Sequence, residues 1–179
     1  MSDLIPATIE IGGDIPRRLV EGLCEAIGVD RPCLRGLLTW PQGEADLLKG
    51  VGDSGTLVLQ DDEARLGEFD AIERFCVENQ VAFDRHSEAR YDYNAENVSF
   101  RPGMKEPQVN MATADGDDFV LVSDLRPLVE QAWESEEFLD RGVVPPRDEN
   151  KRVPLDFLRA VKNLLPDKVP PVGALKITD

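Results

Sequence analysis

The chain is short of the residues that most often build metal centres and disulfide frameworks. It has a single histidine, His86, and three cysteines, Cys24, Cys33 and Cys76, with no C-x-x-C pair. An odd cysteine count argues against a disulfide framework, and a single histidine excludes the multi-histidine zinc sites. Cys24 and Cys76 fall on the apolar faces of predicted helices, so we expect core positions for both. The sequence therefore predicts no metal site and no cofactor.

Long hydrophobic runs are also missing. No uninterrupted apolar stretch approaches the roughly 20 residues of a membrane helix. Residues 1–10 lack the basic segment and the apolar core of a signal peptide. Hydrophobic residues still make up 41% of the 179 residues, which is enough to build a folded core. We expect a folded cytoplasmic protein with no membrane partner.

What the chain has in excess is negative charge, and this charge is unevenly distributed. The sequence has 35 Asp and Glu against 20 Lys and Arg, a formal net charge of -15. Residues 41–84 hold 11 acidic and 3 basic residues, residues 113–140 hold 9 and 1, and residues 141–179 hold 5 and 8. An acidic surface repels phosphate groups and attracts basic proteins. The predicted partner is a basic protein surface, and direct nucleic-acid binding is not expected.

The first hundred residues alternate between strand and helix patterns and then form a run of strands. Period-two alternation predicts strands, and apolar residues three and four positions apart predict helices. Strands are predicted at 7–11, 37–40, 56–60, 81–83, 91–93 and 98–100, and helices at 14–28, 42–49 and 67–79. The pattern indicates an α+β domain with a mixed sheet that contains a strand meander, and with helices mainly on one face.

The remaining residues predict a hairpin and then a helical extension. Asp115-Gly116 is a strong turn signal between strands at 109–113 and 119–122. One helix is predicted from Ser123 or Asp124 to about Arg141, and a second at 155–165. Pro145-Pro146 marks a linker between them. The predicted organisation is an acidic α+β domain at 1–142, followed by a basic, Pro-rich linker and short helix at 143–179.

The run Asp61-Asp62-Glu63, predicted at the end of a strand, is the strongest candidate for metal or acid–base chemistry. Clustered carboxylates provide the oxygen ligands that hard cations require. Neighbouring residues of one strand point to opposite faces, however, so the three cannot all converge without ligands from elsewhere. A divalent-metal-dependent hydrolase that uses this cluster is therefore an alternative function rather than the leading one.

His86 and Ser87 are adjacent and could be taken for a base and a nucleophile. A serine nucleophile needs an aligned base, an orienting acid and an oxyanion hole, which consecutive residues rarely supply. The sequence has no Gly-x-Ser-x-Gly elbow. We expect the segment to be a polar strand end, and no catalytic residue is predicted.

Several short motifs resemble a known group of proteins. They are DDEARxGEF at 61–69, FDRHS at 83–87, YxY at 91–93 and FRPGM at 100–104. Over residues 7–110 the chain resembles uncharacterised small acidic proteins of bacteria, plasmids and phages. No activity is established for that group, so the resemblance implies no functional residue. It implies mobile-element biology, in which small acidic proteins inhibit host defence complexes.

The leading hypothesis is a non-enzymatic, acidic protein-binding module. It would act as a nucleic-acid mimic that inhibits a host nucleic-acid-binding defence complex, of the anti-CRISPR or anti-restriction type, by occupying the Lys and Arg that neutralise phosphates. The residues predicted to bind are carboxylates of the two acidic blocks: Asp61, Asp62, Glu63, Glu68, Asp70, Asp115, Asp117, Asp118, Glu134, Glu136 and Glu137. A further alternative is an acidic globular domain whose C-terminal helix, at 155–165, docks in a groove of the partner.

Overall fold

The computed structural model describes residues 3–34, 40–90, 93–134, 155–165 and 168–179. The chain forms two compact units. The first unit comprises Met1–Asp118 with Val169–Asp179, and the second comprises Phe119–Lys168. The domain boundary predicted between residues 142 and 143 lies outside the described residues.

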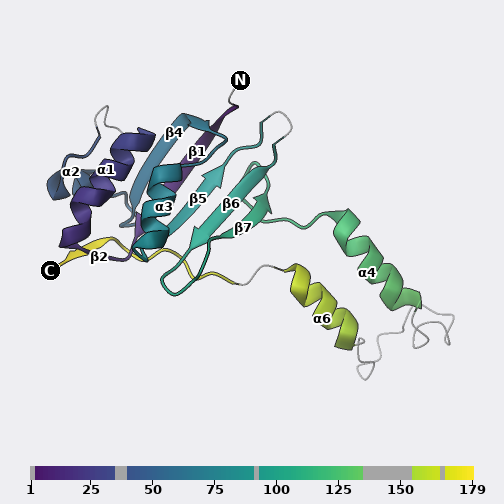
Figure 1. Cartoon of the computed structure of the whole chain (residues 1–179). Coiled ribbons are helices and arrows are strands. Elements are labelled where there is room, and N and C mark those ends of the chain that lie inside the picture. The colour runs from purple at the N-terminus through teal and green to yellow at the C-terminus, as the bar shows by residue number, and fades with distance from the viewer. Residues whose placement is uncertain (1–2, 35–39, 91–92, 135–154, 166–167) are drawn as a thin grey trace. The chain divides into compact units, whose positions relative to one another are not determined.

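The first unit is built on an antiparallel sheet with helices on one face, which confirms the α+β class (Figure 1). The strands lie in the order β3 (Cys33–Leu34), β4 (Leu57–Arg65), β1 (Leu4–Gly12), β5 (Ala82–Ser87), β6 (Ala95–Phe100) and β7 (Gln108–Ala112). The helices are α1 (Val20–Asp30), α2 (Glu44–Lys49) and α3 (Asp70–Glu78), with a 3-10 turn at Arg17–Leu19. Parallel pairing occurs in a separate two-stranded sheet of β2 (Asp14–Pro16) and β8 (Lys176–Thr178).

Alternation along the strands gives the sheet one apolar and one polar face. In β1, Ile5, Ile9 and Ile11 are at most 2% exposed and face the helices, whereas Thr8 and Glu10 are half-buried on the other side. Side chains from α1 and α3 complete the core. No described helix of the first unit covers the polar face, which we call the open face.

An aspartate at the end of α1 caps the start of α3. Asp30 Oδ2 accepts hydrogen bonds from the backbone amides of Ala71, at 2.9 Å, and Ile72, at 2.8 Å. The N-cap residue of α3, Phe69, has no capping side chain of its own. Asp30 therefore stabilises the first turn of α3 and ties the two helices together. The sequence predicted an end of α1 at Gly28, but the helix continues for two residues.

One predicted strand end is wrong because the strand is longer than its apolar segment. β4 extends to Arg65, so Asp61-Asp62-Glu63 lies within the strand rather than at its end, whereas β5 continues to Ser87 and its last residues form the polar strand end that we expected. β1 pairs with the polar ends of both β4 and β5. Backbone hydrogen bonds therefore keep these residues in the sheet, although their side chains show no alternation of apolar and polar residues. Residues 119–122 do not form the predicted strand: only an isolated bridge joins Ala112 to Asp118, and Val122 already begins a helix.

The second unit contains two helices that pack against each other, α4 (Val122–Glu134) and α6 (Leu155–Leu164). The predicted C-terminal helix is present, one residue shorter than expected. The predicted strand at 37–40 and the linker at Pro145-Pro146 fall largely or wholly outside the described residues. In the described part of the chain, no helix combines the length and apolar character needed to cross a bilayer.

Candidate functional site

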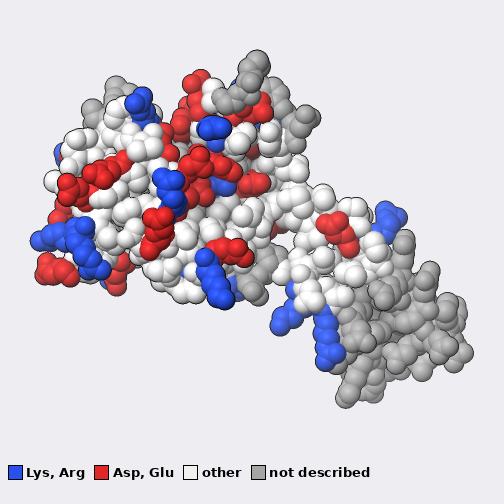
Figure 2. All heavy atoms as spheres, in the orientation of Figure 1, with Lys and Arg blue, Asp and Glu red and all other residues white. Residues whose placement is uncertain are grey.

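Acidic residues from separate segments meet at one end of the main sheet, the end at which β1 begins. The register shows this directly: Arg65 at the end of β4 pairs with Leu4, and Ala112 at the end of β7 pairs with Ala95 at the start of β6. We call the carboxylates there the acidic sheet end: Asp61, Asp62, Glu63, Glu68, Asp70, Asp115, Asp117 and Asp118. Figure 2, which views the helix-bearing face, shows acidic side chains gathered near α3 and the neighbouring strand ends.

These carboxylates face solvent. Asp61 is half-buried and the other seven residues are exposed. Among the ion pairs between described residues, none uses a carboxylate of the acidic sheet end. Two exposed arginines, Arg65 and Arg90, lie at the same end of the sheet. The surface is thus predominantly, though not purely, anionic.

Local hydrogen bonds hold several of these side chains in place. Asp61 Oδ1 accepts a hydrogen bond from the Glu63 amide at 2.9 Å, and Asp62 Oδ1 accepts one from Gln60 at 3.0 Å. Asp118 accepts hydrogen bonds from two asparagine side chains, at 2.8 and 2.9 Å. These neutral donors fix the geometry of the surface without neutralising its charge.

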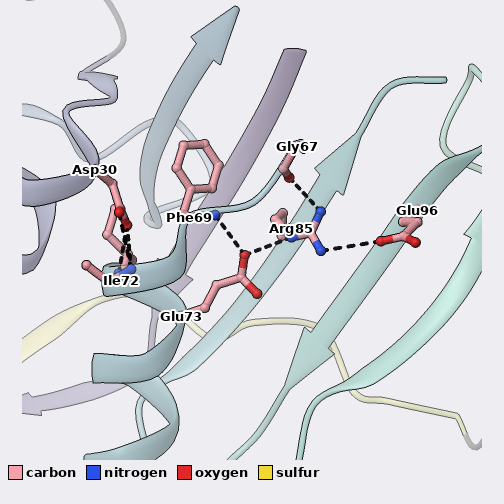
Figure 3. Close-up of polar contacts among 8 residues, drawn as sticks. Asp30, Gly67, Phe69, Ile72, Glu73, Arg85 and Glu96 are labelled. Atoms are coloured by element: carbon pink, nitrogen blue, oxygen red, sulfur yellow. Dashed lines mark hydrogen bonds and ion pairs between the residues drawn. The ribbon is translucent and has the colours of Figure 1, made fainter. Parts of the chain in front are cut away.

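A buried arginine lies beneath the acidic sheet end (Figure 3). Arg85 is 4% exposed and donates to the Gly67 carbonyl at 2.6 Å. Its Nε lies 2.8 Å from Glu73 Oε1, as an ion pair without hydrogen-bond alignment, and a second nitrogen lies 3.5 Å from Glu96. Gly67 has a positive φ of 74°, and a Cβ there would overlap Ser87. Arg85 thereby anchors the turn that leads into α3.

The surroundings of Arg85 disfavour the ionised form of the nearby carboxyl groups. Burial raises the pKa of Glu73 above its ordinary value, the Arg85 guanidinium opposes that rise, and the charges of Glu68 and Asp70 add to it. The pKa of Glu68 is also raised, chiefly by burial. Desolvation and mutual repulsion therefore both disfavour the ionised carboxylates here. A positively charged group that approached this surface would reduce the repulsion.

The structure brings together eight of the eleven residues predicted to bind. Glu134 belongs to α4 in the second unit, and its side chain is not described. Glu136 and Glu137 lie outside the described residues. Among the acidic residues at 113–140 that were predicted to bind, only Asp115, Asp117 and Asp118 can thus be placed beside those at 41–84.

The Asp61-Asp62-Glu63 cluster does not acquire further ligands from the described part of the chain. There, no group of three or more His, Cys, Asp or Glu side chains is arranged to hold a metal ion. The register shifts between Ile5 and Ala7 of β1, so an extra residue of β4 lies opposite this point. Among the described residues, β3 pairs only with Leu59 and Gln60 of β4, so Asp62 and Glu63 lie at the edge of the sheet, where both are exposed.

His86 and Ser87 lie on opposite faces of the sheet. His86 is half-buried on the open face, where its Nδ1 lies 2.8 Å from Asn97 Oδ1, while Ser87 is 3% exposed on the helix side. Because the two side chains point in opposite directions, they cannot act on each other as base and nucleophile.

The open face carries a concavity of about 320 Å³ that the sequence did not reveal. Two rows of cross-strand neighbours line it: Thr8, His86, Asn97 and Asn110 form one row, and Glu10, Asp84 and Ser99 form the other. Asp118 lies beside the first row and joins the concavity to the acidic sheet end. The alternation within each strand indicates which residues lie on the polar face. The sequence does not predict the order of the strands, which brings these residues side by side.

Comparison with protein-family models, with curated proteins and with solved structures finds no match. The resemblance to small acidic proteins of bacteria, plasmids and phages thus stays a prediction, and function has to be inferred from the geometry of the chain itself.

Proposed function

We propose that this protein is a non-enzymatic, acidic protein-binding module that docks its acidic sheet end on a basic surface of a nucleic-acid-binding partner. One observation carries the proposal: carboxylates that are far apart in the sequence meet at one end of the sheet and make no ion pair with a described residue. A docking surface of one sign requires such convergence.

The charge of the first unit supports the same function. Its residues, 1–118 with 169–179, include 25 acidic and 12 basic side chains by count along the sequence. A strongly charged surface speeds encounter with an oppositely charged partner and makes binding depend on salt. A partner that binds nucleic acid offers the clustered Lys and Arg that such a surface fits, and docking there blocks access of phosphates. The protein would then inhibit its partner by mimicry.

A pair of charge-neutralised variants tests the docking surface. The sheet-end variant carries Asp62→Asn, Glu63→Gln, Asp115→Asn and Asp117→Asn. The opposite-end variant is its control and carries Asp14→Asn, Asp53→Asn, Glu78→Gln and Glu106→Gln, at exposed positions near the other end of the strands. Each variant loses four negative charges, so a difference between them reports position rather than net charge.

The probes are purified basic proteins that bind DNA or RNA, with basic proteins that bind no nucleic acid for comparison. We expect the unmodified chain to bind at least one nucleic-acid-binding protein in a salt-sensitive way and to be displaced by duplex DNA. The sheet-end variant should bind at least about fourfold more weakly, because four lost surface charges at roughly 0.2–1 kcal/mol each sum to at least about 0.8 kcal/mol. Failure to bind any of these proteins at low salt, or equal weakening by both variants, would contradict the proposal.

A further inference from the structure

We infer that the concavity of the open face is a guanidinium site, which receives an arginine side chain of the basic partner. This inference rests on the proposed function and names the chemical group that the partner contributes. It comes from the hydrogen-bonding state of the lining side chains, which offer mainly acceptors.

Asn97 has used both N–H donors of its side-chain amide, and Asn110 has used one of its two. Asn97 Nδ2 donates to the Gly116 carbonyl at 2.7 Å and to Asp118 Oδ1 at 2.8 Å. Asn110 Nδ2 donates to Asp118 Oδ2 at 2.9 Å. These contacts fix the orientation of both amides, because only an amide nitrogen can donate a hydrogen bond to a carbonyl or carboxylate oxygen.

The orientation of Asn97 determines the tautomer of His86. Because Asn97 Nδ2 faces two acceptors, Asn97 Oδ1 must be the acceptor in its 2.8 Å contact with His86 Nδ1. His86 Nδ1 therefore carries a proton, and in the neutral ring Nε2 is an acceptor. Nε2 makes no hydrogen bond to another described residue.

Two carboxylates add further acceptors. Glu10 uses Oε2 to accept a 3.2 Å hydrogen bond from Thr56, and its Oε1 has no hydrogen bond to a described residue. Asp84 Oδ2 pairs with Arg101 at 2.7 Å, whereas Asp84 Oδ1 is covered and lacks a donor among the described residues. A covered oxygen without a donor is costly, and the negative charge of this carboxylate adds to the attraction of the concavity for a cation.

The cations beside the concavity are already engaged, which excludes an anionic ligand. Arg101 is 9% exposed and donates to the carbonyls of Phe83 and Phe100, each at 2.8 Å, as well as to Asp84. The side chain of Arg85 points to the helix face. Glu10, Asp84 and Asp118 would thus repel an anion, and they attract a cation.

An arginine side chain fits this set of acceptors better than a lysine. A guanidinium group presents five N–H donors in one plane, so it can bond to several fixed acceptors at once, whereas an ammonium group is a compact point charge. Asp118 belongs both to the concavity and to the acidic sheet end. An arginine that enters here can therefore sit within the same basic surface that docks on the acidic sheet end.

Because His86 is the only histidine, its ring reports on the site without ambiguity. The experiment is a long-range ¹H–¹⁵N NMR spectrum of the full ¹⁵N-labelled chain without a histidine tag, at a pH where the ring is neutral. We expect the Nδ1–H tautomer. Adding an end-blocked Gly-Arg-Gly peptide should shift the Nε2 signal in a saturable way, with Kd on the order of millimolar for so small a ligand. The matched control peptide carries citrulline, which is neutral and has nearly the same shape.

Two variants complete the test. Glu10→Gln should weaken binding of the arginine peptide at least about fivefold, and Asp14→Asn, which removes one charge outside the concavity, should change it less than about twofold. The Nε2–H tautomer, an unmoved ring signal, an equal response to citrulline or an unaffected Glu10→Gln variant would overturn the inference.

These outcomes are distinct from those that test the proposed function. If the sheet-end variant loses the basic protein while the arginine peptide leaves His86 unmoved, the docking surface stands and the guanidinium site falls. If the peptide binds, but the sheet-end and opposite-end variants bind a basic protein as well as the unmodified chain does, the guanidinium site stands and the docking function falls.

Discussion

Glu73 and Arg85 form the buried ion pair that supports the acidic sheet end from beneath. The Glu73 side chain is 18% exposed and the Arg85 side chain 4%. Arg85→Met would leave the buried Glu73 carboxylate without its nearest opposite charge and the Gly67 carbonyl without its donor, so we expect the free energy of unfolding at neutral pH to fall by about 1–3 kcal/mol. Urea unfolding followed by circular dichroism measures this. Arg18→Met, at an exposed arginine, is the control and should stay within about 0.5 kcal/mol.

The raised pKa of Glu73 also predicts the sign of a pH effect. In the window between its ordinary pKa and its raised pKa, the folded protein holds a proton that the unfolded chain has released. Stability therefore falls as pH rises through this window and is recovered as pH is lowered toward the ordinary value. When the free energy of unfolding is plotted against pH across this window, the line for Glu73→Gln should be less steep than the line for the unmodified chain. Identical slopes would show that Glu73 does not contribute to the pH dependence.

At the scale of elements, the cap that α1 provides for α3 can be tested alone. Asp30→Ala removes the acceptor of the Ala71 and Ile72 amides, and we expect a loss of about 0.5–2 kcal/mol in unfolding free energy. Asp30→Asn keeps an oxygen acceptor and should lose less. Equal losses from both substitutions would mean that the charge of Asp30, rather than its hydrogen bonds, stabilises the helix.

The attachment of the C-terminal strand is a second test at this scale. A Cβ at Gly12 would overlap the carbonyl oxygen of Gly173, just before β8. Gly12→Ala is therefore expected to displace residues 173–178 and to speed their hydrogen exchange, as mass spectrometry can detect. Gly28→Ala is the control, because a Cβ at Gly28 meets no atom within 4 Å. Unchanged exchange in the Gly12 variant would contradict the packing of this strand.

The elements with a strong apolar period could be predicted from the sequence, and those without one could not. The alternating residues of β1 and the apolar faces of α1 and α3 carry their own signals. The polar end of β4, which contains Asp61-Asp62-Glu63, is a strand because the first residues of β1 pair with it. β8 follows a Pro-rich segment and forms through pairing with β2, which is distant in the sequence.

At the scale of the whole chain, the sequence predicts the sign of the surface charge but not its arrangement. Asp62 and Asp115 are 53 positions apart, and only the strand register places them at the same end of the sheet. The buried role of Arg85 and the concavity around His86 depend on the same register. The residue types of the candidate site could thus be predicted, whereas their convergence required the fold.

The most direct test of the docking surface is the ratio of the two variants' dissociation constants for one basic nucleic-acid-binding protein, measured at physiological salt. Both variants carry the same net charge, so a purely nonspecific attraction gives a ratio near one. The proposed docking surface predicts that the sheet-end variant binds at least about fourfold more weakly than the opposite-end variant. A ratio near one, or weaker binding by the opposite-end variant, would contradict the claim that the acidic sheet end is the docking surface.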